Sequence, residues 1–237
     1  MSTDYEPEVR DRLIEHLREF VTPRRWQRMQ SVLEDRTRWI TLAIEDVYQP
    51  HNASAVLRSC ECFGIQDVHI VEDRNVYEVN RDVALGAAQW LNLVRHRSEP
   101  TGTAIEACCC VLSQGGYRLV AATPGPDAVS LDDLDVDAGP LAVLFGTELG
   151  GLTPQALTYV HEKVRIPMFG FTESFNISVS AALVLRELTR RLRRSDVDWR
   201  LTESERQELR LRWLRQSVNK SQDLIERFLD SQEGEAA

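Results

Sequence analysis

The segment from Glu173 to Glu187 reads ESFNISVSAALVLRE and places a cluster of small polar side chains directly before an apolar helical pattern. Ser174, Asn176, Ser178 and Ser180 can donate and accept hydrogen bonds, and their small size lets a ligand or another backbone come close. Ser174 is also a good candidate for a plain helix N-cap. The role of the cluster therefore depends on which other loops lie beside it.

A second polar segment, QPHNASAVLRSCECFGI at residues 49–65, follows the apolar run WITLAIE. Asn52 is well placed to cap a helix that begins near Ala53, because Asn is among the best N-cap residues. Arg58 lies about a turn and a half into that helix. Its simplest role is an exposed ion pair with Glu61 at the i+3 position.

A third segment, LFGTELGGL at residues 144–152, follows an apolar strand pattern. Gly146, Gly150 and Gly151 indicate a tight turn whose backbone can approach a ligand closely. The segment is neither a phosphate-binding loop nor a dinucleotide-binding fingerprint, because no Lys-Ser/Thr pair follows and the glycine spacing differs. Glu148 has the simple alternative of a solvated turn carboxylate.

Short β-rich runs alternate with helical patterns through the middle of the chain. This alternation predicts an α/β fold with a largely parallel sheet flanked by helices. Ligands of such sheets collect where the strands end, so all three polar segments lie where a site is expected. The predicted strands are 39–45, 67–72, 91–96, 117–123, 140–146 and 163–168, and the helices between them include 53–63, 100–114 and 154–161.

Helical patterns occupy both ends of the chain. Helices are predicted over residues 8–21, from Pro23 onward, and after a capping box formed by Thr202 and Glu205. The last helix carries an apolar stripe that must be covered by the core or by a partner subunit, and the polar tail SQEGEAA is expected to be frayed. We therefore divide the chain into a helical extension (1–37), a core (38–194) and a second helical extension with the tail (195–237).

The charge distribution separates the same three regions. The net charge is -9, yet residues 185–220 carry 11 Lys and Arg against 6 Asp and Glu, and residues 9–30 carry 6 against 3. Such flanks are either solvated helix faces with internal ion pairs or surfaces that bind phosphate. Both readings remain open at the level of charge alone.

Composition limits the location and the metal content that we expect. No run approaches the ~18 apolar residues of a membrane span, and the first residues lack a secretory apolar segment, so we expect a cytoplasmic protein. The five cysteines are odd in number and lack zinc-site spacing. We therefore expect reduced thiols and no metal.

The three polar segments together carry a resemblance that none carries alone. NASAVLRSCECFG, LFGTELGGL and IPMFGFTESFNISVSAA, in this order, resemble the three signature motifs of the SpoU family of RNA ribose 2′-O-methyltransferases. The resemblance covers roughly residues 38–192. The first motif and the helical ends look most like the TrmH branch, which methylates the D-loop guanosine of tRNA.

The resemblance implies a SPOUT fold with a C-terminal trefoil knot, S-adenosylmethionine as cofactor, tRNA as partner and a homodimer. Phe175 stands where relatives commonly carry Leu. The residues implied at the cofactor are Thr123, Gly146, Ile166 and Phe175, and those implied around the reaction centre are Asn52, Arg58, Glu148, Ser174 and Asn176.

The implied reaction transfers a methyl group from a sulfonium to a ribose 2′-oxygen without a metal. In the family the arginine matched by Arg58 has been proposed as the general base, although a guanidinium has a pKa above about 12. The alternative is that Arg58 grips the phosphate of the target nucleotide. Methylation of ribosomal RNA and a catalytically silent RNA-binding protein are the competing functions.

Overall fold

The computed structural model describes residues 5–75, 77, 86–147 and 150–235. Within these residues, seven strands form one sheet in the order β3-β2-β1-β6-β4-β7-β5, and every neighbouring pair is parallel. The predicted parallel sheet is confirmed, whereas the two-residue β5 was not predicted. The strands are β1 (Ile40–Glu45), β2 (Asp67–Glu72), β3 (Asn92–Arg97), β4 (Arg118–Ala122), β5 (Val129–Ser130), β6 (Leu141–Phe145) and β7 (Glu162–Arg165).

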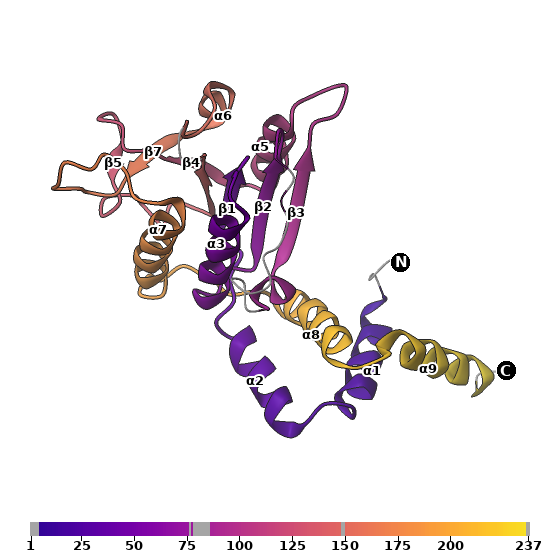
Figure 1. Cartoon of the computed structure of the whole chain (residues 1–237). Coiled ribbons are helices and arrows are strands. Elements are labelled where there is room, and N and C mark those ends of the chain that lie inside the picture. Colours follow the sequence, from indigo (N-terminus) through magenta and orange to yellow (C-terminus); the bar gives the residue numbers. More distant parts are fainter. Residues whose placement is uncertain (1–4, 76, 78–85, 148–149, 236–237) are drawn as a thin grey trace. The chain divides into compact units, whose positions relative to one another are not determined.

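Helices cover both faces of this sheet (Figure 1). Helices α3 (Pro50–Cys62) and α7 (Ile177–Leu192) contact each other and share one apolar cluster with the strands. Helices α5 (Ala104–Gln114) and α6 (Pro154–Tyr159) share the other cluster, and the 3-10 turn η1 (Ala87–Trp90) precedes β3. Because both faces are covered, the central strands β1 and β6 are buried along their whole length, as continuous apolar strands of α/β proteins are.

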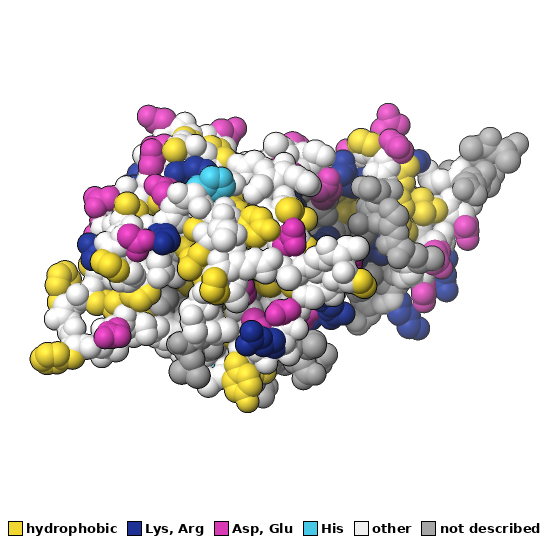
Figure 2. Space-filling view, turned by 90° about the horizontal axis from the view of Figure 1, so that it is seen from above, with side chains coloured by type: hydrophobic (Ala, Val, Ile, Leu, Met, Phe, Trp, Pro, Cys, Tyr) yellow, Lys and Arg dark blue, Asp and Glu magenta, His cyan; other side chains and the backbone are white. Residues whose placement is uncertain are grey.

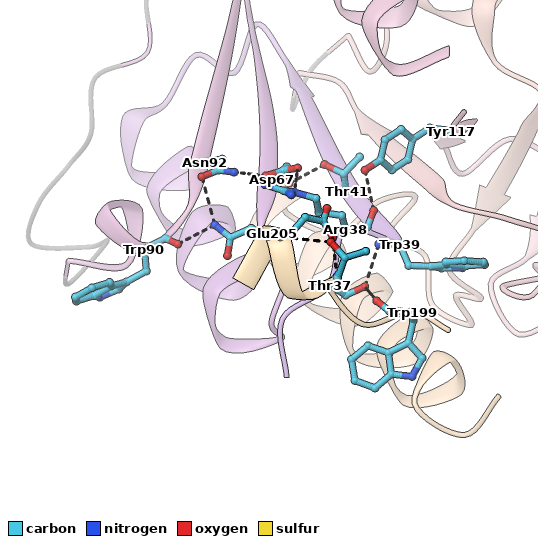
Figure 3. A network of polar contacts seen from close by, with 12 residues as sticks. Thr37, Arg38, Trp39, Thr41, Asp67, Trp90, Asn92, Tyr117, Trp199 and Glu205 are labelled. Atoms are coloured by element: carbon cyan, nitrogen blue, oxygen red, sulfur yellow. Dashed lines mark hydrogen bonds and ion pairs between the residues drawn. The ribbon is translucent and has the colours of Figure 1, made fainter. Parts of the chain in front are cut away.

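Polar side chains hold the amino ends of β1, β2 and β3 together (Figure 3). Thr37 Oγ1 donates to the carbonyl oxygen of Trp199 at 2.6 Å and accepts from the Trp39 amide at 2.9 Å. Asp67 receives the guanidinium of Arg38 at 2.9 Å and the side-chain amide of Asn92 at 2.6 Å. These hydrogen bonds stay within the chain and fix where the strands begin.

The terminal segments, residues 5–36 and 200–235, form a helical unit, and residues 37–199 form a second unit. It contains α1 (Pro7–Arg18), α2 (Pro23–Leu33), α8 (Glu203–Ser217) and α9 (Ser221–Glu235). Thr202 and Glu205 form the predicted capping box. No helix among the described residues is both long and apolar enough to cross a membrane.

The polar tail begins inside α9, which extends to Glu235, and its fraying stays a prediction. One expectation about this helical unit was wrong. The apolar stripe of α8 is covered within the unit, where α1 and α2 contact α8, and so it is not an exposed surface that awaits a partner subunit. The stripe residues Leu209, Trp213, Leu214 and Val218 are all buried.

Candidate active site

A cavity of about 370 Å³ opens at the carboxyl ends of the strands. It is lined by the residues that follow β4, β6 and β7 and by the first turns of α7. Five of the residues singled out from the sequence line it together, although up to 52 positions separate them: Thr123, Gly146, Ile166, Ser174 and Phe175. A volume in this range suits a small organic ligand.

Gly146 stands at the tightest point of the cavity wall. A β-carbon at this position would lie 2.0 Å from the carbonyl carbon of Gly151, so no other residue fits without moving the backbone. The turn is closed by two backbone hydrogen bonds of 3.0 Å between Thr147 and Gly151, and Gly151 has a φ of +65°. The glycines therefore shape a wall of bare backbone against which the flat part of a ligand can lie.

Next to the cavity, two asparagines connect the first and third polar segments. The side-chain amide of Asn176 donates to Asn52 Oδ1 at 3.2 Å, and Asn52 donates to Gln49 Oε1 at 3.2 Å. Asn52 is buried, with 5% of its surface exposed, and the neighbours of Asn176 on both sides line the cavity. The structure thus brings together two residues that are 124 positions apart in the sequence.

Both predicted helix caps near these asparagines were wrong. Helix α3 begins at Pro50, so Asn52 lies in its first turn and Gln49 is the N-cap residue. Proline favours the first helical position because its fixed φ suits the helix, and it moved the start three residues earlier than predicted. Helix α7 is capped by Asn176, whose Oδ1 accepts from the Ser178 amide at 2.8 Å, and not by Ser174.

Arg58 lies on the exposed surface of α3 and does not line the cavity. Within the described part of the chain its guanidinium makes no hydrogen bond or ion pair, so the simple pair with Glu61 is not formed. Its charge is therefore accessible to an outside group. Glu148 lies outside the described residues.

Ser180, from the small polar cluster singled out in the sequence, also lines the cavity. Thr147 and Met168 line the wall too, and the sequence did not single them out as cofactor contacts, although each lies inside one of the three polar motifs. Thr147 Oγ1 accepts from the Gly150 amide at 3.0 Å and so helps to hold the glycine turn. The sequence could indicate only that the motif as a whole lies near the cavity. It could not indicate which of its side chains point into the cavity, because the direction of a side chain in a loop does not follow from residue spacing.

The region that contains the three polar motifs is also the region that matches a known protein family. The model of the SpoU rRNA methylase family matches residues 40–186. This chain belongs to the SpoU family. A tRNA (guanosine(18)-2′-O)-methyltransferase of Borreliella burgdorferi is a family relative 40% identical over 215 residues, which cover 91% of this chain and 95% of that protein.

Other SpoU relatives extend the likeness. The tRNA (guanosine(18)-2′-O)-methyltransferase of Escherichia coli K12 is 30% identical over 193 residues, covering 80% of this chain and 81% of that protein. The crystal structure of the Aquifex aeolicus TrmH/SpoU tRNA modifying enzyme superposes with a TM-score of 0.72 at 24% identity, covering 83% of this chain and 98% of that one. At that identity the superposition supports the fold, and the SpoU assignment rests on the family match and the first relative.

Proposed function

We propose that this chain transfers the methyl group of S-adenosylmethionine to the 2′-hydroxyl of a ribose in tRNA, with the guanosine at tRNA position 18 as the target. The relative at 40% identity spans nearly the whole of both chains and carries this activity in its name. We also propose that the protein is cytoplasmic, which agrees with a tRNA substrate. The helical ends, residues 1–37 and 195–237, are proposed as extensions of a core at residues 38–194 and as the parts that reach the RNA.

One geometric observation carries the proposal. The segments that follow β4, β6 and β7 meet at one cavity, where a wall of bare glycine backbone faces the small polar side chains of Ser174 and Ser180. The residues present fit the cofactor, because the backbone at Gly146 and the apolar side chains of Ile166 and Phe175 can enclose a flat adenosyl group. When bound, the cofactor supplies an electrophilic methyl group on a positively charged sulfur.

The protein's own residues then position the ribose hydroxyl. In this proposal Thr123, Gly146, Ile166 and Phe175 would hold the cofactor. Ser174, Asn52 and Asn176 would face the reacting oxygen, and Glu148, which lies outside the described residues, is proposed for the same role from its motif alone. The side chains around the hydroxyl would hold it in line with the methyl group that the cofactor would supply, and the hydroxyl proton would pass to a base or to water. Holding the two centres in near-attack geometry contributes several kcal/mol, up to roughly 7–11 kcal/mol in ideal cases.

Arg58 is proposed to act on the target nucleotide, either as general base or as the anchor of its phosphate. Its exposed side chain, which has no partner among the described residues, supports the second role, since a guanidinium binds a phosphate with two parallel hydrogen bonds. A pH–rate profile of Arg58→Lys separates the two roles. Recovered activity with a new alkaline limb supports the base, and activity at neutral pH without that limb supports the anchor.

We also propose that two copies of the chain pair. Phe171, Val179 and Leu183 are large apolar side chains left exposed on α7 and the loop before it, and Val179 and Leu183 share one helix face. Figure 2 shows hydrophobic side chains scattered among both acidic and basic ones on the face seen from above. Sedimentation analysis of wild type and Leu183→Glu tests this, with a dimer that dissociates in the variant as the expected result.

The reaction is tested with labelled S-adenosylmethionine and total tRNA, followed by nuclease digestion and mass spectrometry. The proposal expects 2′-O-methylguanosine mapped to the D-loop, and none with Arg58→Ala. Label in ribosomal RNA and not in tRNA would show that the protein is a methyltransferase whose substrate is ribosomal RNA. Cofactor binding without transfer to either RNA would overturn the enzymatic proposal in favour of a silent RNA-binding protein.

A further inference from the structure

A second cluster of reactive side chains lies on the face of the sheet covered by α5, away from the cavity. His69 on β2, His96 on β3 and Cys108 on α5 are all buried, and one ligand atom from each lies within 4.8 Å of the others. Among the described residues this is the one group of three His, Cys, Asp or Glu side chains found in such an arrangement. None of the three lines the cavity of the candidate active site.

The strand register explains why the two histidines meet. Val71 of β2 pairs with His96 of β3, and His69 lies two residues before Val71 on the same face of β2. The imidazole rings stack with centroids 5.2 Å apart and planes 10° from parallel, and His69 Nδ1 lies 2.9 Å from His96 Nε2. Helix α5 packs on this face, contacts both strands and brings Cys108 to the pair.

These three ligand types favour a thiophilic late transition metal. Imidazole and thiolate together are ligands of Zn²⁺ and Cu⁺, whereas Mg²⁺ and Ca²⁺ take oxygen. Zinc lies ~2.0 Å from imidazole nitrogen and ~2.3 Å from thiolate sulfur, so its ligand atoms are roughly 3.3–3.8 Å apart. Metal binding would replace the hydrogen bond between His69 and His96 and would draw the three ligand atoms, which lie within 4.8 Å of one another, toward that spacing.

The surroundings offer negative charge to a bound cation. The carboxylate of Glu45, on β1, is 3% exposed and acts electrostatically on Cys108. It accepts hydrogen bonds from the amide and hydroxyl of Thr153, and within the described part of the chain no cationic side chain pairs with it. A thiolate, a buried carboxylate and two neutral imidazoles would together balance a divalent ion.

We propose that His69, His96 and Cys108 form a structural binding site for Zn²⁺ or Cu⁺ that ties β2, β3 and α5 together. Burial and the neighbouring imidazole of His96 lower the pKa of His69 from 6.5 to about 4, so its ring is neutral and able to ligate at pH 7. Burial and the nearby Cys109 and Glu45 raise the pKa of Cys108, so metal binding releases the thiol proton.

The experiment uses the full chain after treatment with a chelator, titrated with Zn²⁺, with Co²⁺ as a spectroscopic probe and with Cu⁺ under reducing conditions. One equivalent of metal should bind, and Co²⁺ should give a thiolate-to-metal charge-transfer band. Zn²⁺ should raise the melting temperature by about 5–10 °C when its free concentration is 100-fold above Kd. Binding of Cu⁺ and not Zn²⁺, with the same variant pattern, identifies the site as a copper site.

Matched variants locate the site. Cys108→Ala and, as a second variant with an intact thiol, His96→Gln should each weaken metal binding by at least about 100-fold. Cys110→Ala is the control, because Cys110 is the exposed neighbour on the same helix and its loss should change nothing. No binding of any of these metals to the wild type, or equal binding by Cys108→Ala and Cys110→Ala, would overturn the proposal.

Discussion

The two ends of the same sheet use polar side chains in different ways. At the amino ends, Thr37, Asp67 and Asn92 form hydrogen bonds to partners within the chain (Figure 3). At the carboxyl ends, Gly146 and Ser174 border a cavity. The difference teaches that substitutions at the amino ends should change stability, whereas those at the carboxyl ends should change ligand binding and methyl transfer.

The largest effect is expected from Gly146→Ala. Its new methyl group would lie 2.0 Å from the Gly151 carbonyl carbon and would push the turn into the cavity. Affinity for S-adenosylmethionine, measured by calorimetry, should fall by more than about 100-fold, and stability by about 1–3 kcal/mol.

Gly170→Ala is the matched control for that substitution. A β-carbon at Gly170 meets nothing within 4 Å, and its φ lies outside the strained positive range. Affinity should stay within twofold. Equal losses in the two glycine variants would contradict a specific role for the wall at Gly146.

The face of the sheet covered by α5 should differ from the two ends of the sheet in how the stability of the protein depends on pH, because His69 is buried there. The pKa of His69 is lowered from 6.5 to about 4 by burial, so below pH 6.5 the unfolded chain binds a proton that the folded chain does not. Stability of the metal-free protein should therefore be lost as the pH falls from about 6.5 to about 4, by about 3 kcal/mol from this group. Denaturant titrations should show this loss in wild type and in His51→Gln, an exposed control, and a smaller loss in His69→Gln.

The helix caps offer a paired test of moderate size. Asn176 caps α7 beside the cavity, and Thr103 caps α5, where its side chain accepts from the Glu106 amide at 3.3 Å. Replacing either by Ala should cost about 1 kcal/mol of stability. Only Asn176→Ala should also slow methyl transfer, by up to about 100-fold, because it removes the hydrogen bond to Asn52. Equal rates in both variants would assign Asn176 a purely structural role.

The sequence predicted the parallel sheet because alternating β-rich and helical runs allow few other arrangements. It predicted the main loops of the site because those loops follow the carboxyl ends of the predicted strands. It did not predict which residue caps a helix. Asn176 and Ser174 have similar N-cap propensities, and tertiary packing decides between them. The buried His69, His96 and Cys108 cluster was missed because it depends on strand register and on the direction of α5, neither of which is visible in local spacing.

The smallest effect concerns the basic flanks. Arg24 and Arg28 lie exposed on α2 and, within the described residues, make no ion pair, whereas Arg190 is held by Glu187 at 2.5 Å. If both α2 arginines contact RNA phosphates, the double change to Gln should reduce the slope of log affinity for tRNA against log salt by about 1.4. Arg190→Gln should leave the slope unchanged. A slope unaffected by the double change would remove α2 from the proposed RNA surface.

The central claim is tested most directly by the same substitution at two arginines, Arg58 on helix α3 and Arg38 just before β1. Methyl transfer to tRNA per folded molecule and melting temperature are measured for Arg58→Ala and Arg38→Ala. Arg58→Ala should lose about 100-fold or more of the rate with an unchanged melting temperature, because its side chain is exposed. Arg38→Ala should lower the melting temperature by a few degrees at an unchanged rate, because it breaks the 2.9 Å pair with Asp67. Full activity in Arg58→Ala, or a loss of rate in Arg38→Ala without a loss of stability, would contradict the account.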